Sequence, residues 1–141
     1  LSLHDALPIS HVCVVCASPS DATALRAELA LLLGEAAVRL GHNADFTFAA
    51  GVTVTNVRQI KGLEFDVVIV VEPDAVAYPD SEHGRRWLYT VVTRAKERLF
   101  FVGSRDTTPL LAPARDAVLV DVEDLAEVVP VALDEGDDQP F

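Results

Sequence analysis

The sequence predicts an α/β fold in which a parallel sheet is flanked by helices on both faces, giving three layers. Short apolar runs rich in β-branched residues alternate with longer stretches in which leucine and valine recur at helical spacing. The run Phe65–Val71 is almost continuously β-branched, which is typical of an internal parallel strand covered on both faces. Half of the 141 residues are hydrophobic, so the chain can bury the core of a single soluble domain.

The first half of the chain is expected to contain one helix between strands. Ser18 can act as the N-cap of this helix, Pro19 fits its first position and Asp21 its third. The apolar face is formed by leucines at helical spacing, and this pattern can extend past Gly34 to Leu40: Leu25, Leu29 and Leu32. The expected elements are, in order, a strand (Val12–Cys16), this helix (Pro19–Leu40), a short strand or turn (Phe46–Phe48) and a second strand (Val52–Val57).

The second half continues the alternation and ends in an acidic stretch. In chain order we expect a turn or short helix (Arg58–Leu63), a buried strand (Phe65–Val71), a polar loop (Pro73–Gly84) and a helix (Arg85–Glu97). Another buried strand (Leu99–Val102), an edge strand (Ala117–Val120) and a short helix (Glu123–Val128) follow. Strands separated by helices specify parallel pairing with right-handed crossovers. Residues 131–141 are expected to form a disordered acidic tail.

Residues 1–10 are set apart from the fold. They begin LSLHDALPI, which resembles a common sequencing adapter translated in frame. They also lack the basic start and the apolar run of a signal peptide. We therefore expect this segment to be non-native, the native chain to continue upstream, and residues 11–130 to form one domain that is incomplete at its N-terminus.

The net charge of −11 argues at first against a nucleic-acid partner. The charge is unevenly distributed, however. Seven of the eleven basic residues lie between positions 58 and 98, whereas positions 116–138 hold nine acidic residues and no basic one. The middle of the chain is therefore close to neutral, and the acidic end is expected to act as a solvating terminus.

Cys13 and Cys16 form a C-x-x-C pair, the spacing of a redox motif or of half a zinc site. The flanking residues indicate a strand, and residues three apart on a strand point to opposite faces, so the two sulfurs should not meet. The sequence has no second cysteine pair, and His11, His42 and His83 have no partner at ligand spacing. We predict two reduced core cysteines, no metal site and a cytoplasmic location.

The segment Lys61-Gly62-Leu63-Glu64-Phe65 stands directly before the predicted strand at 65–71. Gly62 allows a tight backbone turn, while Lys61 and Glu64 place opposite charges at the edge of the sheet. On the residues alone, these two charges could equally well cap a turn.

The segment Tyr89-Thr90-Val91-Val92-Thr93-Arg94-Ala95 belongs to the predicted second helix. Arg94 then falls at the edge of the apolar face, on the side of Trp87, where it is neither buried nor fully solvated. An arginine in that position can reach into a cleft between domains. The alternative is a surface arginine beside Glu97.

Together the two segments resemble motifs V and VI of the UvrD/Rep-like superfamily-one helicases. The resemblance implies the C-terminal RecA-like domain (2A) of an ATP-dependent DNA helicase or translocase. It implies that ATP with Mg²⁺ is held mainly by a missing N-terminal domain, and that Arg94 is an arginine finger for the γ-phosphate. Glu64 would lie near the ribose, with Gly62 in the coupling element. Tyr89 would either line the ATP cleft or fill the sheet face.

The resemblance also implies contacts with single-stranded or duplex DNA. The T-x-H that commonly precedes the KGLEF segment appears here as Asn56-Val57-Arg58. Asn56 and Arg58, together with Lys61, are the implied nucleic-acid contacts. The departure from T-x-H favours the HelD-like branch, whose members act on RNA polymerase, as an alternative.

Other departures from the family pattern bear on catalysis. Ala17 stands where motif IV usually has an arginine, and the chain contains no G-x-x-x-x-G-K-[ST] phosphate loop. Glu72 and Asp74 end a strand as a Walker B pair would, but the intervening Pro73 and the missing loop argue against that role. We expect the chain alone neither to hydrolyse ATP nor to bind it tightly. A non-catalytic RecA-like binding module is the further alternative.

Overall fold

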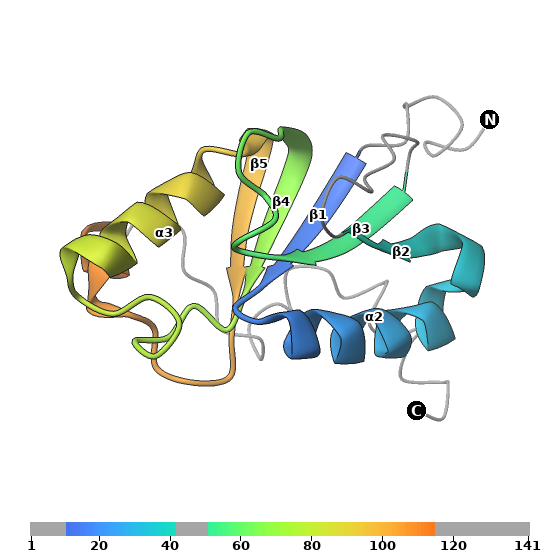
Figure 1. The fold of residues 1–141 in the computed structure, drawn as a ribbon, viewed down its shortest axis with the longest axis horizontal. Helices are drawn as coiled ribbons and strands as arrows, with labels where there is room; N and C mark the ends of the chain where they lie inside the picture. The colour runs from blue at the N-terminus through green and yellow to red at the C-terminus, as the bar shows by residue number, and fades with distance from the viewer. Residues whose placement is uncertain (1–10, 42–50, 115–141) are drawn as a thin grey trace, which may run out of the picture. The chain divides into compact units, whose positions relative to one another are not determined.

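The computed structural model describes residues 11–41 and 51–114. Among these residues, five strands form one parallel sheet in the order β2-β3-β1-β4-β5 (Figure 1). The strands are β1 (His11–Cys16), β2 (Val38–Leu40), β3 (Gly51–Asn56), β4 (Phe65–Val71) and β5 (Ala95–Val102). The predicted α/β fold with an all-parallel sheet is confirmed, and the strands predicted at 12–16, 52–57 and 65–71 agree with β1, β3 and β4 to within one residue.

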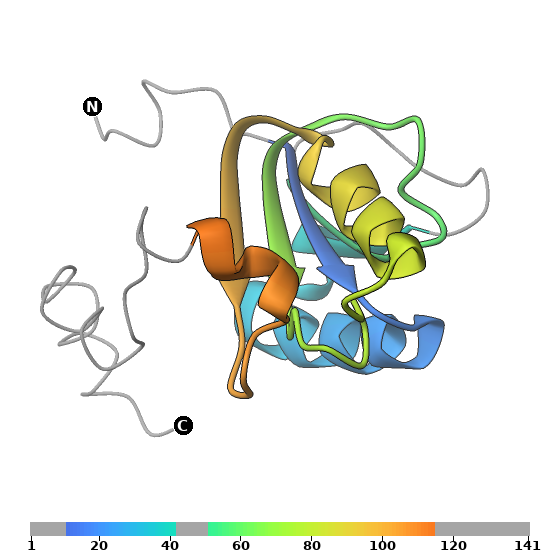
Figure 2. The same ribbon diagram turned by 90° about the vertical axis from the view of Figure 1, so that its left-hand side faces the viewer.

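Two α-helices flank the sheet, α2 (Pro19–Leu33) and α3 (Glu82–Val92). Two 3₁₀ turns, Glu35–Ala37 and Pro109–Ala114, complete the described elements. Helix α2 packs along β1, β3 and β2, whereas α3 contacts β5. Figure 1 shows α2 beneath β1, β3 and β2, and α3 to the left of β4 and β5; Figure 2 shows the same arrangement from the side.

Helix α2 begins as predicted and ends earlier than predicted. The Ser18 hydroxyl accepts a hydrogen bond from the backbone N–H of Asp21 at 3.2 Å. The helix stops at Leu33 because Gly34 adopts a φ of +98°, and its N–H donates to the carbonyl of Ala30 at 2.9 Å. The extension to Leu40 is therefore wrong, since β2 occupies that stretch.

The core forms on both faces of β1. On the α2 side, Val14 pairs in register with Val54 and Ile69, and Leu25 and Leu29 pack against this cluster. The predicted third member of that apolar face, Leu32, is instead 67% exposed. On the other side of the sheet, the registered residues of β1, β3 and β4 are also buried: Cys13, Val15, Thr53, Thr55, Val68 and Val70.

Cys13 and Cys16 are both buried and unbridged, as predicted. Burial raises the pKa of the Cys16 thiol to about 11, with a further contribution from the charge of Asp21. The pKa of Cys13 is raised as well, again mainly by burial. Both sulfurs therefore stay protonated and behave as small apolar core groups.

Helix α3 is shifted towards the N-terminus relative to the predicted helix at 85–97. It starts after Ser81, whose hydroxyl accepts from the N–H of Gly84 at 3.1 Å, and it ends at Val92. Parallel pairing draws the following residues into β5, where Ala95 lies opposite Phe65. The prediction that Arg94 and Glu97 lie on the helix is therefore wrong.

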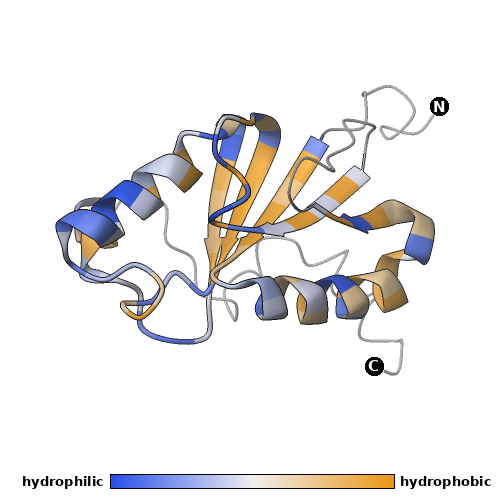
Figure 3. Cartoon of the chain, viewed as in Figure 1, coloured by the Kyte–Doolittle hydropathy of each residue, from blue (hydrophilic) through white to orange (hydrophobic). Residues whose placement is uncertain are grey.

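Strand β5 was predicted to be buried, and in the described part of the chain it is an edge strand. It pairs with β4 alone, which leaves Leu99, Phe100 and Val102 exposed. Figure 3 shows that β5 is hydrophilic near its start and hydrophobic towards its end, whereas the first turns of α3 are hydrophilic.

Some predictions lie outside the described residues. They are the adapter-derived segment 1–10, His42, the element at 46–48, the elements at 117–120 and 123–128, and the tail at 131–141. Neither of the described α-helices is long and apolar enough to cross a membrane.

Candidate functional site

The candidate residues lie at the two opposite edges of the sheet. Residues 57–64 connect the carboxyl end of β3 to the amino end of β4, so in a parallel sheet they must run its full length. Asn56 and Arg58 therefore lie at the carboxyl edge. Glu64 directly precedes β4 and Arg94 directly precedes β5, which places both of these residues at the amino edge.

Arg94 is held at the amino edge by the segment that precedes β4. Its Nη1 donates to the carbonyl oxygen of Leu63 at 3.2 Å, and its own carbonyl oxygen accepts from the N–H of Phe65 at 2.9 Å. Its Nε donates to the carbonyl of Thr90 at 2.9 Å, and its Nη2 donates to the Thr93 hydroxyl at 3.0 Å. The two sequence segments singled out above are thus joined directly through this arginine.

The acceptors around the Arg94 guanidinium are all neutral. No carboxylate of the described residues forms an ion pair with it, and Glu97, the alternative partner, lies on β5. A guanidinium has five N–H donors, and these three bonds leave two of them for another ligand. The side chain is partly buried, as predicted, although it lies in the turn after α3 and not on the helix.

The turn before β4 has the geometry that its sequence predicts. Gly62 has a φ of +82°, a value that favours glycine, and the N–H of Leu63 donates to the carbonyl of Ile60 at 3.2 Å. Lys61 and Glu64 are both exposed, and neither forms an ion pair with another described residue. Both charges are therefore available to a ligand or to a second domain.

Tyr89 is 69% exposed on α3. It does not fill the face of the sheet, so that alternative is wrong. A position lining a cleft with another domain stays a prediction.

Asp66 is an amino-edge residue that the sequence analysis missed. Its carboxylate accepts from the N–H of His11 at 3.1 Å and lies 3.5 Å from the Lys96 ammonium. The His11 hydrogen bond is the main reason why the pKa of Asp66 lies below its usual value, with a smaller contribution from Lys96. Asp66 therefore links the starts of β1, β4 and β5. The sequence signal for Asp66 was a single carboxylate within a run of β-branched residues.

At the carboxyl edge, a cavity of about 620 Å³ lies between the end of β1, the start of α2, the segment at 57–58, the loop after β4, and α3. The guanidinium carbon of Arg58 lies 5.9 Å from the centre of the Trp87 ring. Trp87 Nε1 donates to His83 Nε2, and these two rings meet edge to face with centroids 5.5 Å apart. Asn56 is buried, and its side-chain oxygen accepts from the N–H of Arg58 at 3.0 Å.

The comparisons with known proteins identify the segment that contains these residues. The family model of the UvrD-like helicase C-terminal domain matches residues 51–102. The matched segment begins with β3 and ends with β5, so it contains both the turn at Gly62 and Arg94.

The fold of the chain is also similar to a solved helicase domain. The C-terminal domain of a possible DNA helicase from Lactobacillus plantarum WCFS1 is 34% identical, with a TM-score of 0.63. The similarity covers 75% of this chain and 63% of that chain, so this chain spans less than two thirds of its structural relative. No curated protein sequence matched the chain.

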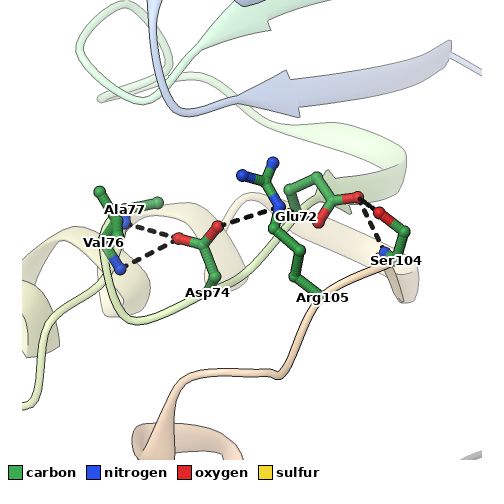
Figure 4. Close-up of polar contacts among 6 residues, drawn as sticks. All are labelled: Glu72, Asp74, Val76, Ala77, Ser104 and Arg105. Carbon is green, nitrogen blue, oxygen red and sulfur yellow. Dashed lines mark hydrogen bonds and ion pairs between the residues drawn. The ribbon is translucent and has the colours of Figure 1, made fainter.

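The UvrD-like segment is joined at its carboxyl edge to the loop that follows β5 (Figure 4). Glu72 accepts from the N–H and the hydroxyl of Ser104, at 2.8 and 2.7 Å, and from Arg105 Nε at 3.0 Å. The bonds from Ser104 are the main cause of the lowered pKa of Glu72. Asp74 lies 3.5 Å from Arg105 and also accepts from two backbone N–H groups in the loop after β4, those of Val76 and Ala77.

Both carboxylates of this cluster are thus engaged by the chain itself. Glu72 also has a φ of +51°, which is strained for a residue with a side chain, and its interactions with Ser104 and Arg105 hold it there. Among residues 11–41 and 51–114, no group of three acidic, histidine or cysteine residues could hold a metal ion.

Proposed function

We propose that this chain is the C-terminal RecA-like motor domain of an ATP-dependent DNA helicase or translocase. In this proposal it supplies Arg94 to ATP that is held mainly by a second RecA-like domain. The observation that carries the proposal is the environment of Arg94, a partly buried guanidinium bound by neutral oxygens with two N–H donors to spare. A cation held in this way keeps its charge for an external anion.

The proposed role of Arg94 is to stabilise negative charge on the phosphoryl group as it is transferred. Arginines in this role raise the turnover rate by about 10³–10⁵. At the same edge, the exposed carboxylate of Glu64 can accept a hydrogen bond from a ribose hydroxyl. Of the ATP site, we assign Arg94, Glu64 and the turn at Gly62 to this chain. The phosphate loop and the Mg²⁺ ligands are assigned to the second domain.

The carboxyl edge is the proposed contact with nucleic acid. Arg58 and Lys61 are exposed cations at the two ends of a short stretch that leads from this edge towards the amino edge. Binding of a strand and binding of ATP would therefore act on the same connection, residues 57–64, and on its neighbours. Opening and closing of the cleft between the two domains would then move the protein along the strand.

The test is ATP turnover by the full-length protein that contains this domain. Arg94→Ala should lower the rate at least about a hundredfold, and Arg94→Lys should restore only a small part of it because lysine cannot bind bidentately. Circular dichroism and the unfolding midpoint should show that the Ala variant stays folded. Unchanged turnover in a folded Arg94→Ala protein would overturn the proposed role.

The alternatives make different predictions in the same assay. An ATPase that is stimulated by RNA polymerase but not by single-stranded DNA would indicate the HelD-like activity. A full-length protein with no ATP turnover and no phosphate loop would indicate a binding module.

A further inference from the structure

The connection at 57–64 is attached to the α3 region at both of its ends. At the carboxyl edge, the guanidinium of Arg58 lies over the ring of Trp87. At the amino edge, Leu63 accepts a hydrogen bond from Arg94, two residues after the end of α3. Between these attachments, Ile60 in the connection and Val91 in the helix are completely buried. The connection is therefore attached to α3 at one edge and to the turn that follows α3 at the other.

Trp87 is fixed to α3 but is only weakly attached to Arg58. Its indole N–H donates to His83, one turn earlier on the same helix. Arg58 is exposed, and within residues 11–41 and 51–114 it forms no ion pair, so the aromatic ring is the contact that holds its guanidinium. A phosphate binds a guanidinium more strongly than an aromatic ring does, because the bond is charge-assisted and can be bidentate. An anionic strand can therefore compete with Trp87 for the position of Arg58.

We propose that Trp87 is a positioning residue that couples the state of Arg58 to the position of Arg94. When Arg58 leaves the ring, α3 loses this one contact with the connection, and the resulting shift of the helix carries Arg94, in the turn at its other end, with it. Trp87 and Arg94 are seven positions apart, and α3 ends between them at Val92. The coupling is a property of this chain, and its use in strand-stimulated ATP turnover rests on the proposed function.

The coupling can be measured in this chain without a ligand. The Arg94 Nε–H resonance, assigned by its loss in Arg94→Lys, reports the position of the guanidinium. Arg58→Ala should shift this resonance, and Trp87→Leu should shift it in the same direction. The double variant should show the shift of one single variant and not the sum, because both changes break the same contact. Trp87→Phe, which keeps a ring face, should stay close to wild type.

Arg86→Ala is the matched control for Arg58→Ala. It also removes an exposed positive charge, one residue from Trp87, but its partner is Glu82 and not the ring. It should leave the Arg94 resonance within about a fifth of the Arg58→Ala shift. Shifts that add in the double variant, or an Arg94 resonance that does not respond to Arg58→Ala, would overturn the proposal. Either result would leave the proposed ATP-dependent function standing, since Arg94 could act without this coupling.

A second arm adds a short oligothymidylate to the chain. Trp87 is its one tryptophan, so the indole N–H resonance and the fluorescence report this position without ambiguity. The Trp87 and Arg94 signals should move with the same midpoint in the wild type, and the Arg94 response should fall at least fivefold in Trp87→Leu. A full Arg94 response in a Trp87→Leu protein that still binds would contradict the coupling. An absence of binding would count against the nucleic-acid contact and leave the mutational test to decide.

Discussion

Tyr78 and Thr108 give a pair of substitutions with opposite expected effects on stability. Tyr78 is completely buried, and its hydroxyl has no hydrogen-bond partner among the residues that the structure describes. Its backbone carbonyl, in contrast, accepts from the buried Thr108 hydroxyl at 2.6 Å. Burial is the main cause of the raised pKa of the phenol, so the hydroxyl stays protonated and uncharged in the folded protein.

The magnitudes follow from what each change leaves behind. A buried hydroxyl without a partner costs about 1–3 kcal/mol, so Tyr78→Phe should leave the free energy of unfolding unchanged or raise it by up to that amount. Thr108→Val keeps the shape of the side chain but removes the donor. It leaves the Tyr78 carbonyl unpaired in the interior and should lower the free energy of unfolding by about 1–3 kcal/mol.

Urea unfolding followed by circular dichroism measures both changes, provided that the slope of the transition is the same in each variant. The double variant should be close to the sum, because the phenol and the carbonyl are separate groups of Tyr78. A loss of more than about 1 kcal/mol in Tyr78→Phe would refute the reasoning. It would mean that the hydroxyl contributes a favourable interaction to the folded state.

Three further predictions concern the packing and the charges of the fold. Gly84→Ala should destabilise the chain by more than about 3 kcal/mol in the same unfolding assay, because its Cβ would lie 1.8 Å from the Pro79 carbonyl oxygen. Leu32→Ser should change the stability by less than about 0.5 kcal/mol, whereas Leu29→Ser, at a partly buried core position, should cost at least about 2 kcal/mol. Equal effects of these two substitutions would contradict the assignment of the apolar face. The hydrogen bonds from Ser104 lower the pKa of Glu72 in the folded state, so their contribution to stability is present above the unfolded pKa near 4.5 and is lost as the pH falls through the folded value. Ser104→Ala should therefore weaken the dependence of the unfolding free energy on pH below about pH 4.5, and an unchanged acid profile would count against this.

The sequence was sufficient for the inner strands and for the start of α2. Strands β1, β3 and β4 are short, β-branched and bounded by polar residues, so local preference and burial in the sheet agree. The cap at Ser18 and Pro19 is equally local. Predictions of this kind succeed because no distant contact is needed to decide them.

The end of α3 could not be predicted because two periodicities overlap there. Leu88, Val91, Ala95 and Leu99 continue a helical spacing straight into β5. The pairing of Ala95 with Phe65 decides the boundary, and that contact spans thirty residues. The exposure of β5 could not be predicted either, because it follows from the place of β5 at the end of the strand order. The sequence pattern of an apolar strand does not distinguish an edge strand from an inner strand.

The motif resemblance proposed the members of the candidate site but not their arrangement. The motif resemblance selected Gly62, Glu64 and Arg94, and the structure brings the turn and the arginine into direct contact. The separation of Arg58 from this group depends on the direction of β4, which follows from the parallel pairing. The contact between Arg58 and Trp87 joins positions 29 apart and had no local signal.

A comparison of two arginines in the same domain supports a functional assignment for Arg94. Arg105 is more than half exposed and its Nε bonds to Glu72, with Asp74 also within 3.5 Å. These carboxylates raise its pKa and largely cancel its field, so Arg105 serves to fix two loops together.

Arg94 is more buried, yet the oxygens that bind it are carbonyl and hydroxyl groups. Partial burial without a counter-ion is costly for the folded domain on its own, because the charge loses hydration and gains no ion pair. In the proposed function, an anion that arrives from outside the domain would recover that cost. The arrangement therefore favours a cation that is oriented in advance for a ligand, and the surrounding oxygens fix its direction without consuming its charge.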